Sequence, residues 1–394
     1  MPLLLVLALG VFAGALSMRV IDPVVPEVAR DLATTTSTVA LLASAFAFPY
    51  AFSQPLLGPL ADSMGKARII KIFLGVLTAA MLVSALAPSI ETLFAARIVA
   101  GIAAGGVIPV AFAIVGDRFD LADRHVALSR IILAAVTGQL TSSIAAGFIA
   151  AIFGWRIVLA ITGVVAFATL VATILYLSPR QKAQRTQFTL SGLKSGYATI
   201  FADPRAYVCY GAVATEGLVV YGMAPYVATL LEAKGLGGIR EAGIVIAGIG
   251  IGGVIYAALV RVLLKWLGGK FNIMRGGGVI AASGFGLIAL QPVWPLQFAG
   301  FVLVGLGFFM VHNVLQVQAT ELAPNARGSA IALHSFFFFL GQAAGPVAYG
   351  TGFSAIGVLM TVLFAAVIML IMGFTSAGAL QRLEARSGGK APSS

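Results

Sequence analysis

Four ionisable side chains stand in or beside stretches of sequence that are otherwise apolar: Arg19, Asp22, Arg97 and Glu216. A charge at the centre of a membrane-spanning helix costs at least about 2.5 kcal/mol on insertion scales, so residues of this kind are functional candidates by default. A carboxyl in such a place can take up a proton from one side of a membrane and release it to the other. We therefore expect these four residues to couple proton movement to another process.

The strongest of the four candidates is Glu216. It lies ten residues into the apolar stretch 206–231, and no Lys or Arg stands within a helical turn of it. At 1.5 Å per residue it sits about 15 Å along a helix, close to the middle of a membrane. The alternative is a carboxyl that stays protonated and hydrogen-bonded within the helix packing.

The other three candidates lie in the first half of the chain. Arg19 precedes Asp22 by one helical turn, on the same face, so the pair is either a coupling site or an interfacial salt bridge. Arg97 could pair with Asp22 or Glu216, or bind an anionic substrate.

Uncharged polar residues within apolar stretches are candidates for lining a substrate cavity. His312 and Gln316 are one turn apart and form a polar stripe with Asn313, although a lone histidine in a membrane helix can also be a packed hydrogen-bonding residue. The aromatic clusters Phe46, Phe48, Phe52 and 336–339 are expected to face lipid rather than substrate. The full set of expected cavity residues is Tyr50, Gln54, Gln139, Tyr221, His312, Asn313, Gln316 and Gln342.

Composition places these residues in a membrane protein. Of 394 residues, 60% are hydrophobic and only 10% are charged, against about 25% charged in a soluble domain. Long continuous apolar runs predict helices, since barrel strands are about 10 residues long and alternate in polarity. The expected fold is an all-α membrane protein with twelve transmembrane helices at 3–25, 37–60, 70–88, 92–116, 127–152, 155–177, 206–231, 241–265, 274–291, 294–320, 329–351 and 353–377.

The sequence does not indicate an enzyme. It holds three histidines and the single cysteine Cys209, and it lacks a Gly-rich phosphate loop followed by Lys-Ser/Thr. These counts argue against a metal site, a disulfide and ATP hydrolysis. We expect no catalytic residues, no metal and no cofactor, so uphill work would use an ion gradient, with protons the simpler choice over sodium.

The net charge of +11 is explained by topology rather than by nucleic acid. Alternate loops carry 19 of the 25 Lys and Arg residues. The positive-inside rule makes that side cytoplasmic and predicts that both termini lie there. The expected location is the inner membrane of a bacterium, with lipid, protons and a small-molecule substrate as partners and a monomeric chain.

The two halves of the chain resemble each other. Gly65 and Gly268 are 203 residues apart, as are Arg124 and Arg327, Gly138 and Gly341, and Gly147 and Gly350, while Gly101 and Gly305 are separated by 204. This register indicates a duplication into two pseudo-symmetric six-helix bundles with a substrate site at the midplane and alternating access. The expected domains are bundles at 1–177 and 206–378, a cytoplasmic central loop with an interfacial helix at 178–205, and a cytoplasmic tail at 379–394.

Several motifs resemble those of the major facilitator superfamily. "GPLADSMGKAR" at 58–68 resembles its loop between helices 2 and 3, "LFAARIVAGIAAG" at 93–105 its helix 4, and "APNARGSAIAL" at 323–333 the loop before helix 11. "MRVIDPVVPEVARDL" at 18–32 resembles the end of helix 1 in twelve-span drug:proton antiporters. The resemblance implies a major facilitator fold over the whole chain.

The same resemblance implies a cytoplasmic gate. In the family the loop at 58–68 latches the two halves together in the outward-open state, with Arg118 and Arg124 as partners of Asp62. Gly58 allows close helix contact, and Gly65 allows a turn with positive φ. The expected gate residues are Gly58, Asp62, Gly65, Lys66, Arg68, Arg118 and Arg124.

One feature departs from the antiporter pattern. Ser142 and Ser143 stand where those transporters carry a Gly-Pro pair in helix 5, whereas helix 11 carries Gly345 and Pro346. The sequence favours proton-coupled efflux of small hydrophobic or amphipathic compounds. The alternatives are a proton-coupled permease for an organic anion or a sugar, a lipid transporter, and a non-transporting sensor.

Overall fold

The computed structural model describes residues 3–177, 197–323 and 327–388. Within these ranges, the side chains of residues 57–59, 61–63, 121, 122 and 125 lie outside the description. The described backbone is helical almost throughout and contains no strand, which confirms the predicted all-α class. Most of the predicted central loop is outside the described residues, but 197–201, the end of its expected interfacial helix, is helical.

Contacts between residues group the chain into two compact units. The first contains the described residues of Met1–Thr189 and Met223–Ala247, and the second those of Leu190–Gly222 and Gly248–Ser394. In the first unit lie α1 (Leu3–Leu16), the 3-10 helix η1 (Asp22–Val24), α2 (Val25–Asp31), α3 (Thr36–Met64), α4 (Lys66–Ala85), α5 (Ile90–Arg118), α6 (Leu121–Phe153), α7 (Trp155–Tyr176), the 3-10 helix η2 (Ala224–Tyr226), α10 (Val227–Ala233) and the start of α11 (Ile239–Leu267). In the second lie α9 (Pro204–Gly222), the rest of α11, α12 (Lys270–Ala289), α13 (Trp294–Glu321) and α14 (Arg327–Gly388).

The described helices account for the twelve predicted crossings. Ten helical stretches are long and apolar enough to span a membrane. The last, Arg327–Arg386, is interrupted at Gly357, whose φ of 80° and ψ of 167° are not helical, so it supplies two crossings. The 14-residue α1 is shorter but apolar and supplies the remaining one. The final interruption falls a few residues beyond the predicted one near 352, and helical structure continues into the predicted tail as far as Gly388.

The prediction of one continuous helix over 3–25 is wrong. α1 ends at Leu16, residues 17–21 form turns, and η1 and α2 follow. Pro23 and Pro26 lie in the first turns of η1 and α2. A proline costs little there, whereas inside one long helix each would remove a backbone hydrogen bond. The predicted span 206–231 is broken in the same way, between α9 and α10, with Pro225 in η2.

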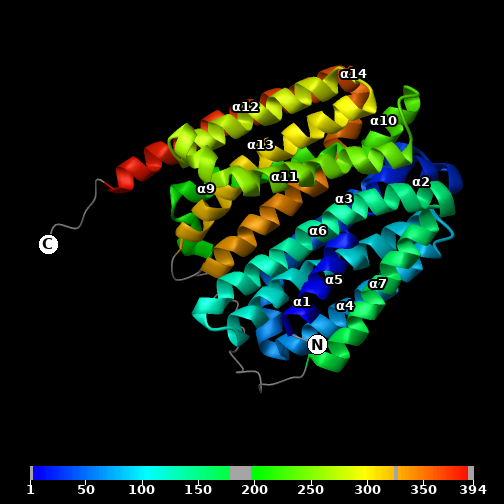
Figure 1. Ribbon diagram of the computed structural model, residues 1–394, viewed down its shortest axis with the longest axis horizontal. Coiled ribbons are helices and arrows are strands. Elements are labelled where there is room, and N and C mark those ends of the chain that lie inside the picture. Colours follow the sequence, from blue (N-terminus) through cyan, green and yellow to red (C-terminus); the bar gives the residue numbers. More distant parts are fainter. Residues whose placement is uncertain (1–2, 178–196, 324–326, 389–394) are drawn as a thin grey trace. The chain divides into compact units, whose positions relative to one another are not determined.

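In the first unit, α1 packs against α5, α6 and α7, and α5 also packs against α3 and α4 (Figure 1). The backbones of α3 and α5 come very close at one glycine. A Cβ added to Gly101 would lie 2.2 Å from the carbonyl oxygen of Phe46, so only glycine fits there. This crossing brings Arg97, one turn before Gly101, onto the face of α5 that meets α1 and α3.

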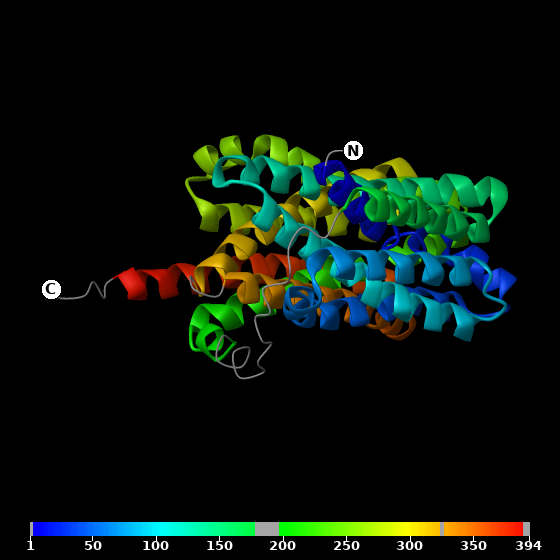
Figure 2. The same ribbon diagram turned by 90° about the horizontal axis from the view of Figure 1, so that it is seen from below.

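In the second unit, α9 packs against α13 and α14, and α12 packs against α13 and α14. In Figures 1 and 2 the last turns of α14, in red, extend past the other helices of this unit. The crossing of α11 and α13 repeats that of α3 and α5, because a Cβ on Gly305 would lie 2.1 Å from the carbonyl oxygen of Ile249.

The predicted duplication is visible in the local structure of both halves. η1 begins at Asp22 and η2 at Ala224, 202 residues later. Gly65, with φ 91°, precedes α4, and its counterpart Gly268, with φ 74°, stands in the turn before α12. The division of the chain into domains at 177 and 206 stays a prediction.

Candidate functional site

The break after α1 exposes backbone carbonyls inside the protein, and two polar side chains satisfy them. The last carbonyls of a helix have no partner within the helix. The hydroxyl of Ser142 in α6 donates to Leu16 O at 2.6 Å. Arg97 Nη1 donates to Ser17 O at 2.8 Å and Nη2 to Met18 O at 3.3 Å. A cation also suits the negative end of a helix dipole, so Arg97 stabilises the break electrostatically as well.

Arg97 is fully buried and is covered on one face by an aromatic ring. Its guanidinium carbon lies 4.3 Å from the ring centroid of Phe46, a cation–π contact. The sequence predicted that Phe46 faces lipid, but in the structure it is a buried packing residue. Phe48 and Phe52 are exposed. In the structure the guanidinium donates to the two carbonyls after α1, and the alternatives expected from the sequence, pairing with Asp22 or Glu216 or binding of an anionic substrate, stay predictions.

The predicted pair of Arg19 and Asp22 forms, with 3.4 Å between Nη1 and Oδ2. Both side chains are buried, at 7% and 1% exposure, and whether the pair is a coupling site or an interfacial salt bridge stays a prediction. The pair lies in the break and at the start of η1, not along one helix face. Within the described part of the chain, Asp22 Oδ1 has no hydrogen-bond partner, so the carboxylate has capacity for another donor.

The second polar cluster lies in the second unit and is built around Glu216. This residue of α9 has no exposed surface, and its Oε1 is hydrogen-bonded to Nδ1 of His312 in α13. Glu216 Oε2 has no hydrogen-bond partner among the described residues. The sequence singled out both residues but not their pairing, because 96 residues separate them.

His334 of α14 belongs to the same cluster and was not among the predicted site residues. Its ring centroid lies 4.9 Å from that of His312, edge to face, and its side chain is 2% exposed. Its Nε2 lacks a hydrogen-bond partner within the described ranges. The available signal in the sequence was spacing, because His334 stands one helical turn before Phe338. In the structure both rings contact His312.

Aromatic rings surround the Glu216–His312 pair. Phe308 and Phe338 stack at 5.8 Å, and each ring centroid lies 4.9 Å from that of His312. Tyr221, one of the predicted cavity residues, meets both phenylalanines edge-on. A buried carboxyl is therefore presented within a largely apolar, aromatic setting.

The other predicted cavity residues are divided between the units. In the first unit Tyr50 is buried, Gln139 is half-buried, and Gln54 Nε2 donates to Gly105 O at 2.9 Å, which ties α3 to α5. In the second unit Gln342 is buried, Asn313 and Gln316 are exposed, and Tyr256 donates to Asn313 Oδ1 at 3.2 Å. That they line one cavity stays a prediction.

The predicted cytoplasmic gate is described only in part. Gly58 and Asp62 fall on residues whose side chains lie outside the description, so the latch between Asp62 and Arg118 or Arg124 stays a prediction. Gly65 has the expected positive φ of 91°.

Two cations of the predicted gate bind the end of α5. Lys66 pairs with Asp117 at 2.7 Å. Arg124 Nη2 donates to Gly116 O at 2.7 Å, which satisfies a carbonyl in the last turn of α5. Arg68 and Arg118 are exposed.

A charged cluster on α2 was missed by the sequence analysis. Asp31 accepts hydrogen bonds from Arg156 and from Trp155 Nε1, and the first of these lowers the pKa of its carboxyl. Burial raises the pKa of Glu27, whose Oε1 accepts from the backbone N–H of Trp155. The signal was the concentration of charges directly after the first apolar stretch.

The same short helix carries a further ion pair. Arg30 Nη1 lies 2.8 Å from Glu232 Oε2 of α10, and both helices belong to the first unit. This contact joins two positions that are 202 residues apart in the sequence.

Comparison with known proteins agrees with this architecture. The family model of the Major Facilitator Superfamily matches residues 7–346. The MFS-type transporter YwfA of Bacillus subtilis is 27% identical over 379 residues, covering 91% of this chain and 89% of that protein. Multidrug resistance protein 1 of the same organism is 23% identical over 353 residues, covering 88% of each chain.

The fold also matches that of a solved transporter. The crystal structure of a mutant of the nucleoside transporter NupG has a TM-score of 0.77 and 16% sequence identity, covering 97% of this chain and 100% of that one. With a family model that spans most of its length and a fold of the same type, the chain belongs to the major facilitator superfamily of membrane transporters.

Proposed function

We propose that this transporter exports small hydrophobic or amphipathic compounds in exchange for protons, by alternating access of the two repeats. The observation that carries the proposal is the buried pair of Glu216 and His312. A carboxyl inside a membrane-spanning helix is costly unless it has a partner or binds a proton. A residue kept in such a place is suited to changing its charge during a transport cycle.

The geometry of the pair gives each group a role. A proton that binds Glu216 removes the charge of the carboxylate, and a proton that leaves restores it next to the His312 ring. Glu216 Oε2 has no partner among the described residues, so it can accept a proton or a donor group of the substrate. Exchange results when substrate and proton compete for this one carboxyl.

The surroundings of Glu216 support the substrate class. Tyr221, Phe308 and Phe338 offer aromatic surface and little charge, which suits apolar and amphipathic compounds. The similarity to a protein named for multidrug resistance supports export as the direction.

An organic-anion permease receives less support. Both Nη atoms of Arg97 are engaged with carbonyls after α1, and Arg19 is paired with Asp22, so neither is positioned primarily for an anionic substrate. A sugar or nucleoside-like metabolite would instead use uncharged donors such as Tyr50 and Gln342.

The proposal includes the topology and the coupling residues expected from the sequence. The chain is placed in the inner membrane of a bacterium with both termini cytoplasmic, as a monomer. In the first unit, the Arg19–Asp22 pair and Arg97 shape the break after α1 and contribute to coupling through it.

The test is transport of protons and drug by the purified chain in proteoliposomes. With an inward-acidic gradient, adding a substrate found in a growth-protection panel should release protons from the lumen. Glu216→Gln should abolish both protection and substrate-driven proton release, and His312→Gln should reduce the rate of proton release by about a hundredfold, as for loss of a proton-transfer group.

Glu91→Gln is the matched control, because Glu91 is an exposed carboxyl in the first turn of α5. It should transport like the wild type. Full drug-driven proton release by Glu216→Gln, at equal amounts of reconstituted protein, would disprove the coupling role. Protection that persists without any proton flux would instead point to a passive or sodium-driven carrier.

A further inference from the structure

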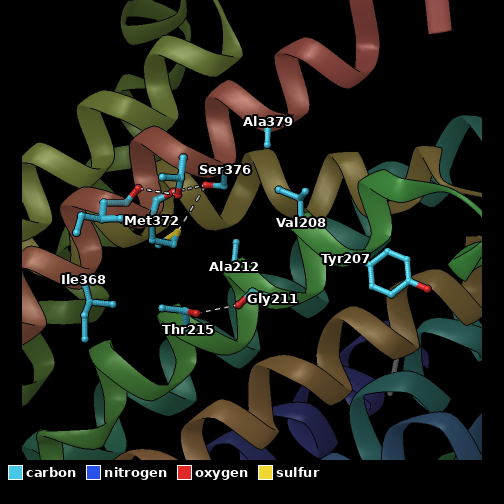
Figure 3. A pocket seen from close by; sticks show the side chains of 11 residues that line it. Tyr207, Val208, Gly211, Ala212, Thr215, Ile368, Met372, Ser376 and Ala379 are labelled. Carbon is cyan, nitrogen blue, oxygen red and sulfur yellow. Dashed lines mark hydrogen bonds between the residues drawn. The ribbon is translucent and has the colours of Figure 1, made fainter. Parts of the chain in front are cut away.

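The second unit carries an open groove that none of the predicted site residues enters. It has a volume of about 480 Å³ and lies between the first half of α9 and the later part of α14 (Figure 3). One wall includes Tyr207, Gly211 and Thr215, and the other includes Ile368 and Met372. The lining of the groove contains none of the residues of the Glu216 cluster, and it contains no charged residue.

The serine and threonine hydroxyls of the groove are already hydrogen-bonded. Thr215 donates its hydroxyl hydrogen to Gly211 O at 2.9 Å, and Thr375 donates to Ile371 O at 2.8 Å. Ser376 likewise donates to Met372 O (Figure 3). Because these hydroxyls are used within their own helices, the walls present mainly carbon surface. A hydrocarbon chain suits such a surface.

The length of the groove also suits a hydrocarbon chain. Its lining on α14 runs from Ile368 to Ala379, which corresponds to about 16 Å at 1.5 Å per residue. Tyr207 and Ile371 of its lining are 64% and 55% exposed, so an occupant can enter the groove from outside the protein.

Two arginines continue the groove-facing side of α14 beyond its end. Arg382 and Arg386 follow Ala379 by three and seven residues, which places them on the same helix face, one and two turns further on. Both are exposed, and neither forms an ion pair with any residue that the structure describes. Figures 1 and 2 show this end of α14 extending past the other helices of the second unit.

The basic residues nearby are different, because they have acidic partners. Arg205 binds Asp203 with 2.6 Å between Nη2 and Oδ2, and Lys270 binds Glu384 at 2.6 Å. Two unpaired cations at the outer end of an apolar groove complement an anionic head on an acyl chain.

We propose that this groove binds an anionic phospholipid, with an acyl chain between α9 and α14 and the phosphate at Arg382 and Arg386. This site lies on the bilayer-facing side of the second unit and is separate from the proposed proton-coupling pair. It therefore stands whether or not the chain exports drugs.

The test is native mass spectrometry of the detergent-purified full chain with phosphatidylglycerol and with phosphatidylcholine that carry the same acyl chains. The wild type should bind phosphatidylglycerol more tightly. The double variant Arg382→Gln with Arg386→Gln should bind phosphatidylglycerol more weakly, by about fivefold per arginine. Its binding of phosphatidylcholine should be unchanged. Gly211→Leu should weaken both lipids, because a Cβ at Gly211 meets nothing within 4 Å and the leucine would fill the groove without a clash.

Matched controls separate the site from the rest of the bilayer-facing surface. Gly286→Leu adds the same side chain on α12, where a Cβ also meets nothing within 4 Å. Arg261→Gln with Lys265→Gln removes two exposed cations from α11. Both controls should bind lipid like the wild type. An unchanged lipid preference in the Arg382/Arg386 variant, or unchanged binding in Gly211→Leu, would overturn the proposal, as would equal losses in the controls.

Discussion

Arg97 closes the end of a broken helix, and this role sets what its replacement should do. Its two Nη atoms reach two successive carbonyls, Ser17 O and Met18 O, in a fully buried place. A fork of planar donors can do this, whereas a lysine offers one compact charge. The stability of the break therefore depends on the type of cation as well as on its charge.

We expect Arg97→Gln to lower the free energy of unfolding by about 1–3 kcal/mol, the usual penalty for buried polar groups left without partners. Arg97→Lys should lose less, because it keeps the charge near the end of the helix dipole. The measurement is the apparent midpoint of thermal unfolding in detergent, with tryptophan fluorescence as the readout. Arg130→Gln, an exposed arginine on α6, is the control and should unfold like the wild type. Equal midpoints for Arg97→Gln and wild type would contradict this role.

The sequence predicts single charged residues better than it predicts their partners. The sequence identifies Glu216 and Arg97 because a charge within an apolar stretch is visible without any partner. It does not identify His312 as the partner of Glu216, because that contact depends on how α9 and α13 pack. Ser142 was noted as a departure from a family pattern, but its purpose needs the carbonyl of Leu16, which becomes available only because α1 stops there.

At the scale of helices, glycine decides which pairs pack backbone to backbone. The crossing of α3 and α5 at Gly101 and that of α11 and α13 at Gly305 place carbonyl oxygens where a side chain would otherwise stand. Gln54, on α3, adds a hydrogen bond to Gly105 O at the next turn of the first crossing.

Gly101→Ala should therefore destabilise the chain by about 1–3 kcal/mol, the range for overpacking a tight interior. Gly116→Ala on the same helix is the matched control, because a Cβ there meets nothing within 4 Å. That variant should be stabilised by up to about 1 kcal/mol, since alanine favours helix. Thermal midpoints of both variants give the answer. A Gly101→Ala variant as stable as Gly116→Ala would show that α3 and α5 can separate at little cost.

Helices were largely predictable, and their breaks were not. Long apolar runs set the spans, because a bilayer requires about 20 apolar residues. The break after Leu16 lies inside the span predicted at 3–25, and the polar residues Ser17, Arg19 and Asp22 directly after it do not show by themselves where the helix ends. Pro23 and Pro26 were the available local clue, and the matching Pro225 in the second half strengthens it.

At the scale of the whole chain, α2 and α10 are equivalent elements of the two repeats, and they are joined by Arg30 and Glu232. Both short helices belong to the first compact unit, so this ion pair links the two repeats within that unit. Its exposure, 63% for Arg30 and 31% for Glu232, means that it contributes little energy and can exchange readily.

Reversing one charge should loosen both short helices. We expect Arg30→Glu to increase hydrogen–deuterium exchange in peptides covering α2 and α10 by up to about fivefold, which corresponds to about 1 kcal/mol for an exposed pair. The double reversal Arg30→Glu with Glu232→Arg should restore protection. Lys234→Glu, an exposed neighbour of α10, is the control and should have no effect. Failure of the double reversal to recover protection would mean that the charges do not act on each other.

The Arg30–Glu232 contact also bears on the origin of the duplicated chain. The two residues are 202 positions apart, the same spacing that separates η1 from η2, so they occupy equivalent positions in the two repeats. In a homodimer of identical half-length chains, arginine would meet arginine or glutamate would meet glutamate, and the contact would be repulsive. A single chain that holds both halves is free of that constraint, since each half can carry its own charge at this position.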